Sequence, residues 1–166
     1  MRDKLAIVNE KDEVIGESYL DTMMPDEIYR AASLLIENSK GQYLIAKRMY
    51  SMLRNPGLWG PAVEGTVKKG ETYHETIIRE ITEEIGIKIK DKELKKLIKE
   101  RVKIPYNHFK QWYYMRLDLP IKKFKIQRSE VQNIKWINKN KLIDLAKKDS
   151  KILTPSFKEF ILKNLK

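Results

Sequence analysis

Three glutamates within five residues form the part of this sequence whose residue types and spacing most directly suggest chemistry. Glu80, Glu83 and Glu84 would crowd like charges onto one surface of a helix, and Arg79 is the one basic residue directly beside them. Carboxylates, together with water and substrate phosphates, are the ligands that Mg²⁺ prefers, so an external divalent cation is the natural compensation for this charge. The alternative is an acidic helix face in contact with solvent.

The helix that must position these carboxylates is predicted over residues 73 to 85. Thr72 and Glu75 have the spacing of a capping box, and Gly86 stands where a left-handed C-terminal cap belongs. At about 100° per residue, the carboxylates share one face and the isoleucines another. We therefore expect the helix to display its carboxylates and to bury four isoleucines, namely Ile77, Ile78, Ile81 and Ile85.

A longer pattern surrounds this helix. Gly65 is followed after five residues by Glu71, and after seven more by the run Arg79-Glu80-Ile81-Thr82-Glu83-Glu84-Ile85-Gly86-Ile87. The pattern resembles the Nudix box, G-x5-E-x7-R-E-U-x-E-E-x-G-U with U an aliphatic residue, at every specified position. A match of this length is far more specific than a single glycine motif.

This resemblance implies an α/β fold of the Nudix type, an α/β/α sandwich in which a mixed sheet carries helices on both faces. It also implies a metal-dependent hydrolase that attacks diphosphate bonds with an activated water, because clamped metal ions both neutralise phosphate charge and orient the nucleophile. The cofactor implied is Mg²⁺, with Mn²⁺ as a second candidate.

The resemblance assigns roles residue by residue. The metal ligands would be Glu80, Glu83, Glu84 and the carbonyl of Gly65. Glu80, or a carboxylate from a loop, would deprotonate the water, while Arg79 and Glu71 would pair and hold the loop against the helix. Glu130 stands where many relatives place a further carboxylate near the metals, although an exposed glutamate at the start of a strand needs no function. The residues expected to act in catalysis are Glu80, Glu83, Arg79 and Glu71.

The first 90 or so residues also resemble the isopentenyl-diphosphate isomerase group of Nudix proteins, through IVNEKDEVIGE, ASLLIENSKGQYLIAKR and PGLWGPAVEG. Those isomerases use a cysteine just before the box glycine and a metal-binding histidine just after it. Glu64 and Thr66 occupy these positions, and the chain has no cysteine, so we expect a hydrolase. Hydrolases often carry glycine at position 64, and the glutamate here is either a modest backbone adjustment or an additional acid near the metals.

The remaining elements are predicted from local patterns, as one Nudix domain over residues 1–166 with an N-terminal extension (1–30), the box (65–87) and C-terminal helices (139–166). Asn138 is expected to cap the first of these helices, and Thr154 with Pro155 to begin the second, whose apolar stripe is Phe157, Phe160, Ile161 and Leu165. An irregular loop is expected over 49–61. Strands are expected at 5–8, 32–36, 61–67, 97–104, 111–119 and 131–137.

Composition limits the class of protein. Of the 166 residues, 42% are hydrophobic and 34% charged, which favours a folded chain, and no apolar run reaches the roughly 20 residues that span a bilayer. We therefore expect a cytoplasmic protein that does not associate with a membrane. Disulfides and cysteine-based sites are excluded because there is no cysteine.

Charge is uneven along the chain. The net charge is +11, but residues 1–87 hold 11 basic against 15 acidic residues and residues 88–166 hold 23 against 8. This bias favours binding to polyanions such as RNA, or it is the dispersed lysine surface of a Lys-rich protein.

Substrate identity is only weakly indicated. We expect a small-molecule diphosphate such as a nucleoside diphosphate, a nucleotide sugar or a nucleoside triphosphate. The alternatives are diphosphate removal from RNA 5′ ends and a non-catalytic, ligand-sensing domain; the oligomeric state stays open, with a dimer among the options. Arg48, Arg54, Lys68 and Lys69 are candidates for phosphate contacts. Four aromatic rings, which either stack on a base or belong to the core, are Trp59, Tyr106, His108 and Trp112.

Overall fold

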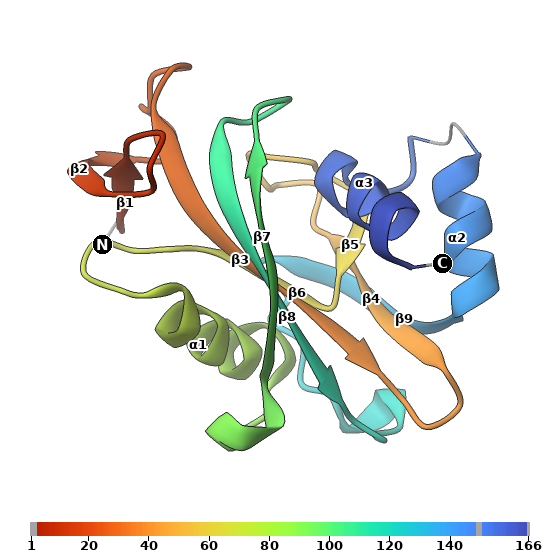
Figure 1. Ribbon diagram of the computed structural model, residues 1–166. Coiled ribbons are helices and arrows are strands. Elements are labelled where there is room, and N and C mark those ends of the chain that lie inside the picture. Colours follow the sequence, from red (N-terminus) through yellow and green to blue (C-terminus); the bar gives the residue numbers. More distant parts are fainter. Residues whose placement is uncertain (1–2, 149–150, 166) are drawn as a thin grey trace.

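The computed structural model describes residues 3–148 and 151–165, and its framework is one nine-stranded sheet (Figure 1). The strands are β1 (Lys4–Val8), β2 (Val14–Tyr19), β3 (Ile28–Glu37), β4 (Gln42–Arg48), β5 (Trp59–Pro61), β6 (Val63–Thr66), β7 (Lys95–Val102), β8 (His108–Arg116) and β9 (Val131–Asn138). The helices are α1 (Tyr73–Ile85), α2 (Lys139–Lys147) and α3 (Pro155–Asn164), with short 3₁₀ turns at Asp91–Glu93 and Ile121–Lys123.

Strand β3 is the centre of the sheet. It pairs antiparallel with β1, β4 and β6, and parallel with β8 in a register that runs from Tyr29 opposite His108 to Glu37 opposite Arg116. The strands β2, β7 and β9 extend the sheet by antiparallel pairing with β1, β8 and β4. The mixed sheet predicted from the resemblance is therefore confirmed.

Helices cover both faces of this sheet, as expected, with α1 on one side and α2 and α3 on the other (Figure 1). On the α1 side, three of the four isoleucines predicted to be buried, Ile77, Ile81 and Ile85, are fully buried against residues of β3 and β6, whereas Ile78 is only partly buried. On the opposite side, Phe157 and Phe160 of α3 pack around Trp112 of β8. The two cores fix the sheet from both sides.

Helix α1 has the predicted bounds, and its capping box is formed. The Thr72 side chain accepts a hydrogen bond from the backbone N–H of Glu75, the Glu75 carboxylate accepts one from the backbone N–H of Thr72, and Gly86 is left-handed with φ of 70°. The expectation that α1 displays all its carboxylates is wrong. Glu80 and Glu84 are only 8% and 5% exposed, because β6 lies over that side of the helix.

Other boundaries differ from the predictions for identifiable reasons. Strand β2 was not predicted, and β5 takes the last three residues of the expected loop. Strand β8 begins at His108 rather than at residue 111, since its first six residues are all buried in the middle of the sheet and show no alternation of polar and apolar residues. Asn138 and Thr154 stand at the helix starts but make no side-chain capping hydrogen bond, and Leu165 lies just beyond α3.

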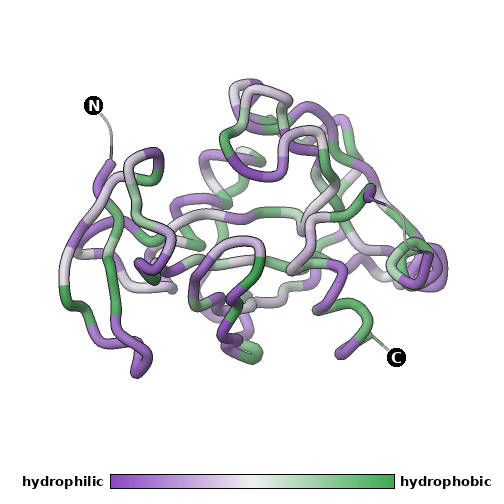
Figure 2. The backbone as a smooth tube through the Cα atoms, turned by 90° about the horizontal axis from the view of Figure 1, so that it is seen from above, coloured by the Kyte–Doolittle hydropathy of each residue, from purple (hydrophilic) through white to green (hydrophobic). Residues whose placement is uncertain are grey.

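Hydrophobic and hydrophilic stretches are interspersed along the whole tube of the backbone (Figure 2). Within residues 3–148 and 151–165, no helix combines the length and apolar character needed to cross a bilayer.

Candidate active site

A cavity of about 550 Å³ opens where α1, β3, β6 and β8 meet the loop of residues 49–58. The predicted site residues that line it are Gly65, Arg79, Glu80, Glu83, Glu130, Arg48 and Lys68. Glu84 lies in an adjoining cavity of about 20 Å³ that Arg48, Glu64 and Glu130 also line. The fold thus brings residues as far apart in the sequence as Arg48 and Glu130 to the same cavity.

Arg79 is the hub of the ion pairs at this site. Its Nε and Nη2 donate to the two carboxylate oxygens of Glu71 at 2.8 and 3.0 Å, and its Nη1 donates to Glu80 at 2.7 Å and Glu83 at 2.9 Å. Glu71 also accepts a hydrogen bond from Thr76 Oγ1 at 2.8 Å. The two-point contact between Arg79 and Glu71 fixes the loop that precedes α1 against the helix.

Glu80 and Glu84 form an acidic pair in a poorly solvated place. Burial, followed by the charges of Glu130 and Glu83, raises the pKa of Glu80 to about 7 in spite of the opposing charge of Arg79. Burial and the nearby Glu80 raise the pKa of Glu84 well above its usual range. Glu84 Oε2 accepts a hydrogen bond from the backbone N–H of Glu64 at 3.2 Å. Such a pair is stabilised by a cation, which would offset the repulsion.

The chain matches the NUDIX domain family over residues 28–159. The chain belongs to the Nudix family. It is 29% identical to an uncharacterized Nudix hydrolase of Listeria monocytogenes over 141 residues, which cover 82% of this chain and 80% of the relative. A 91-residue stretch is 31% identical to the isopentenyl-diphosphate Delta-isomerase of Enterobacter, covering 54% of this chain and 50% of that protein, in agreement with the likeness seen in the N-terminal region.

The structure agrees with this assignment. The crystal structure of DR0079 from Deinococcus radiodurans superposes with a TM-score of 0.83 at 25% identity, covering 97% of this chain and 98% of the other. These likenesses make the chain an enzyme of the Nudix pyrophosphohydrolase type. Nudix enzymes generally carry out metal-dependent hydrolysis of nucleoside diphosphates that are linked to another moiety.

The Nudix glycine Gly65 lies directly against Glu80. A Cβ atom at this position would overlap the Glu80 carboxylate and its Cγ. Glycine is therefore required here for the close approach of strand β6 to the acidic face of α1, and not for a left-handed backbone.

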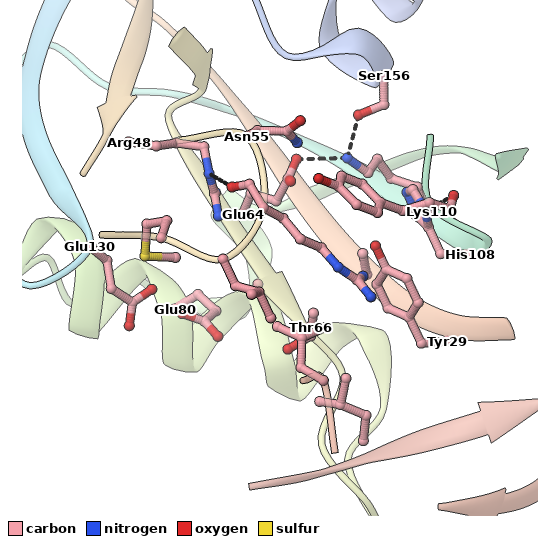
Figure 3. A pocket seen from close by; sticks show the side chains of 18 of the residues that line it. Tyr29, Arg48, Asn55, Glu64, Thr66, Glu80, His108, Lys110, Glu130 and Ser156 are labelled. Carbon is pink, nitrogen blue, oxygen red and sulfur yellow. Dashed lines mark hydrogen bonds and ion pairs between the residues drawn. The ribbon is translucent and has the colours of Figure 1, made fainter. Parts of the chain in front are cut away.

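Glu130 comes from a different part of the chain and faces the same space. It immediately precedes β9, and its backbone carbonyl accepts a hydrogen bond from Met49 N at 2.8 Å. Figure 3 shows its carboxylate beside Glu80, on the side of the pocket away from Lys110. Its charge contributes to the raised pKa values of both Glu80 and Glu84.

The donor set fits a hard divalent cation. Across residues 3–148 and 151–165, no three acidic or histidine side chains already converge as a metal site. Arg79 contacts the carboxylates of Glu80 and Glu83 instead. Nevertheless the charge of Glu130 acts on both Glu80 and Glu84, and oxygen ligands of this kind suit Mg²⁺ or Mn²⁺.

Glu64 has a role that the sequence did not reveal. Its Oε2 pairs with Lys110 Nζ at 2.7 Å and accepts a hydrogen bond from Ser33 Oγ at 2.9 Å, while Lys110 also donates to Ser156 Oγ of α3 at 2.7 Å (Figure 3). Although burial raises the pKa of Glu64, the charges of Lys110 and Arg48 lower it to about 2. A lysine within the aromatic run HFKQWYY was the one available signal of this buried pair.

Some of the remaining candidates for phosphate or base contacts line the pocket, and others lie outside it. Arg54, Tyr106 and His108 line the pocket, and Lys68, which also lines it, pairs with Asp3 at 2.9 Å. Lys69 instead pairs with Glu17. Of the two tryptophan candidates, Trp112 is buried in the core, and Trp59 packs at the edge of that core with Lys135 Nζ 4.3 Å from its ring centre.

Proposed function

We propose that this chain hydrolyses the diphosphate bond of a nucleoside diphosphate linked to another moiety, in the 550 Å³ pocket. The observation that carries the proposal is that carboxylates and cationic side chains line the same pocket. Glu80, Glu83 and Glu130 line it together with Arg48, Arg54, Lys68 and Lys110, of which Lys68 pairs with Asp3 and Lys110 with Glu64. A diphosphate flanked by divalent cations is complementary to such a mixture of charges.

The roles of the residues follow from their environments. Glu80, Glu83, Glu84 and the Gly65 carbonyl would hold Mg²⁺, with Mn²⁺ as the second candidate, and Glu130 would add a carboxylate at the same place. When bound, the metal would neutralise phosphate charge and lower the pKa of a bound water. Arg79 and Glu71 keep the loop and helix together, so that Gly65 stays against Glu80.

Glu80 is the residue we assign to proton transfer. Burial raises its pKa to about 7, and a general base needs a pKa near the working pH. Arg48 and Lys68 would contact the phosphates, because each is a cationic side chain that lines the pocket. We further infer that the chain works as one Nudix domain, supported by a single sheet that includes both β1 and β9.

The test is hydrolysis of a panel of nucleoside diphosphates, nucleotide sugars and nucleoside triphosphates with Mg²⁺, followed by phosphate detection. Turnover should stop in EDTA, and Glu80→Gln should lower kcat by a hundredfold or more in order of magnitude. Glu159→Gln, which changes an exposed glutamate on α3, is the matched control and should leave kcat unchanged.

Two outcomes would refute the proposal. One is undiminished turnover without a divalent cation. The other is a change of less than about threefold in Glu80→Gln. RNA carrying a 5′ triphosphate belongs in the same panel, because a rate far above that of the free nucleotide would favour RNA ends as the substrate, with the steep salt dependence that lysine contacts give.

A further inference from the structure

Two tyrosine rings in the pocket both contact one planar guanidinium group. The guanidinium carbon of Arg54 lies 4.4 Å from the ring centre of Tyr29 and 4.6 Å from that of Tyr106. Tyr29 belongs to the central strand β3, whereas Arg54 belongs to the loop between β4 and β5. All three residues line the pocket that also contains Glu80.

His108 holds the two walls of this slot in place. Its ring stacks on Tyr29 with 4.9 Å between ring centres, and its Nδ1 donates a hydrogen bond to the backbone carbonyl of Tyr106 at 2.8 Å. The backbone N–H of Tyr29 also bonds to the carbonyl of Asn107 at 3.2 Å. Tyr29 stands opposite His108 in the parallel pairing of β3 with β8, so the sheet fixes these two residues, and the His108 hydrogen bond ties the backbone of Tyr106 to them.

The guanidinium of Arg54 interacts with the Tyr29 side chain, but one of its terminal nitrogens has no hydrogen-bond partner. Arg54 Nη1 is buried and has no hydrogen-bond partner, and Nη2 meets a sulfur, Met23 Sδ, at 3.6 Å. Among the described residues, no carboxylate forms an ion pair with this guanidinium. A buried donor without a partner costs about 1–3 kcal/mol. The Nε2 atom of His108, next to the slot, is likewise buried without a partner.

We propose that the slot between Tyr29 and Tyr106 is the binding site for a nucleobase, and that Arg54 fills it only until substrate arrives. Aromatic rings pack with their centres about 4.5–7 Å apart, so a base in place of the guanidinium would lie at normal stacking distance from both tyrosines. This inference rests on the proposed function, which supplies the nucleoside. The inference adds the place where the base binds and names Arg54 as the side chain that must leave the slot.

The loop allows this exchange. The backbone carbonyl of Arg54 accepts a hydrogen bond from Arg48 Nε at 3.0 Å, so the main chain stays anchored while the side chain moves. Once outside the slot, the Arg54 side chain remains in a pocket whose substrate carries phosphate charge. The competing interpretation is that Arg54 keeps its position and binds phosphate directly.

The two interpretations predict opposite effects of Arg54→Ala on ligands that lack phosphate. Adenosine, guanosine, cytidine and uridine are titrated in EDTA, with ribose as the base-free control, and binding is followed by NMR. Removal of the occupant should lower the Kd of at least one nucleoside by about 5- to 10-fold, because the slot no longer has to be emptied first. Protons of the base should shift upfield, as stacking on tyrosine requires. Ribose should be unaffected.

Changes to the wall complete the test. Tyr106→Phe should preserve nucleoside binding, and Tyr106→Ala should weaken it at least about fivefold, since stacking on an aromatic ring contributes most of the affinity for a base. Arg116→Ala, at the exposed end of β8, is the matched control for loss of an arginine and should change nothing.

Unchanged or weaker nucleoside binding in Arg54→Ala would overturn the proposal, and so would upfield shifts that persist at full strength in Tyr106→Ala. Weaker binding of inorganic pyrophosphate in Arg54→Ala, with nucleosides unaffected, would establish Arg54 as a phosphate ligand instead. Because every measurement is made in EDTA, none depends on hydrolysis. Absence of hydrolysis and absence of nucleoside binding to the slot are therefore separate results, so failure of the proposed function can be told apart from failure of this inference.

Discussion

Gly65 and Glu80 are packed so closely that a single methyl group on Gly65 would occupy the space of the Glu80 carboxylate. The contact joins strand β6 to helix α1 where both line the pocket. Position 65 therefore sets how near the backbone of β6 comes to the expected metal ligands.

The first prediction uses this contact in a double-mutant cycle. Gly65→Ala should destabilise the protein by about 1–3 kcal/mol through overpacking, and the same change in a Glu80→Ala background should cost much less, since the overlapping atoms are gone. Urea denaturation of the four proteins in EDTA gives the coupling energy. Additive effects would show that the two residues do not compete for one space.

The second prediction concerns the buried Glu84. Glu84→Gln should abolish hydrolysis yet raise the melting temperature of the metal-free protein by a few degrees, because an amide can accept the Glu64 N–H bond without repelling Glu80. Glu83→Gln, which changes an exposed carboxylate paired with Arg79, should alter stability little. Thermal melts in EDTA beside an activity assay decide the matter. A large drop in melting temperature with turnover retained would make Glu84 structural.

The third prediction is a dependence of stability on pH that comes from His108. Burial, aided by the charge of Lys110, lowers the pKa of His108 to about 3, whereas an unfolded histidine has a pKa of about 6.5. Between these values the unfolded chain binds more protons than the folded one. The stabilisation from neutral His108 is therefore complete above pH 6.5 and is lost as the pH falls towards 3.

The matched variant is His108→Gln, which cannot titrate. Below pH 6.5 the free energy of unfolding of the wild type should fall relative to this variant, by up to about 1.4 kcal/mol per pH unit. Urea denaturation at pH 7, 6, 5 and 4.5 measures the difference. Parallel curves for the two proteins would mean that His108 takes up a proton equally well in the folded state.

The fourth prediction tests the buried pair of Glu64 and Lys110. Lys110→Met should destabilise the protein by about 1–3 kcal/mol, because it leaves the partly buried Glu64 carboxylate with the Ser33 hydroxyl but without its charged partner. The double variant Lys110→Met, Glu64→Leu should recover most of that loss. Denaturation curves of both provide the comparison. If the double variant is no more stable than the single one, the pair itself is not the source of the effect.

The sequence by itself determined the element that carries the chemistry. The bounds of α1, its capping box and its left-handed Gly86 were all predicted, because caps and helical periodicity depend on residues within one or two turns of each other. The box spacing from Gly65 to Ile87 likewise identified the family, which the match over residues 28–159 confirmed. These signals depend only on residues near one another in the chain, so they can be recognised from the sequence alone.

Only the tertiary structure decided which of these side chains are buried and what they contact. Glu80 and Glu84 share a face with the exposed Glu83, yet β6 covers the first two. Lys110 meets Glu64 across 46 positions of sequence. His108 reaches Tyr29 because β3 and β8 pair in parallel. Burial and pKa depend on chain segments brought together from far apart, and no pattern within one segment specifies which distant segment will cover it.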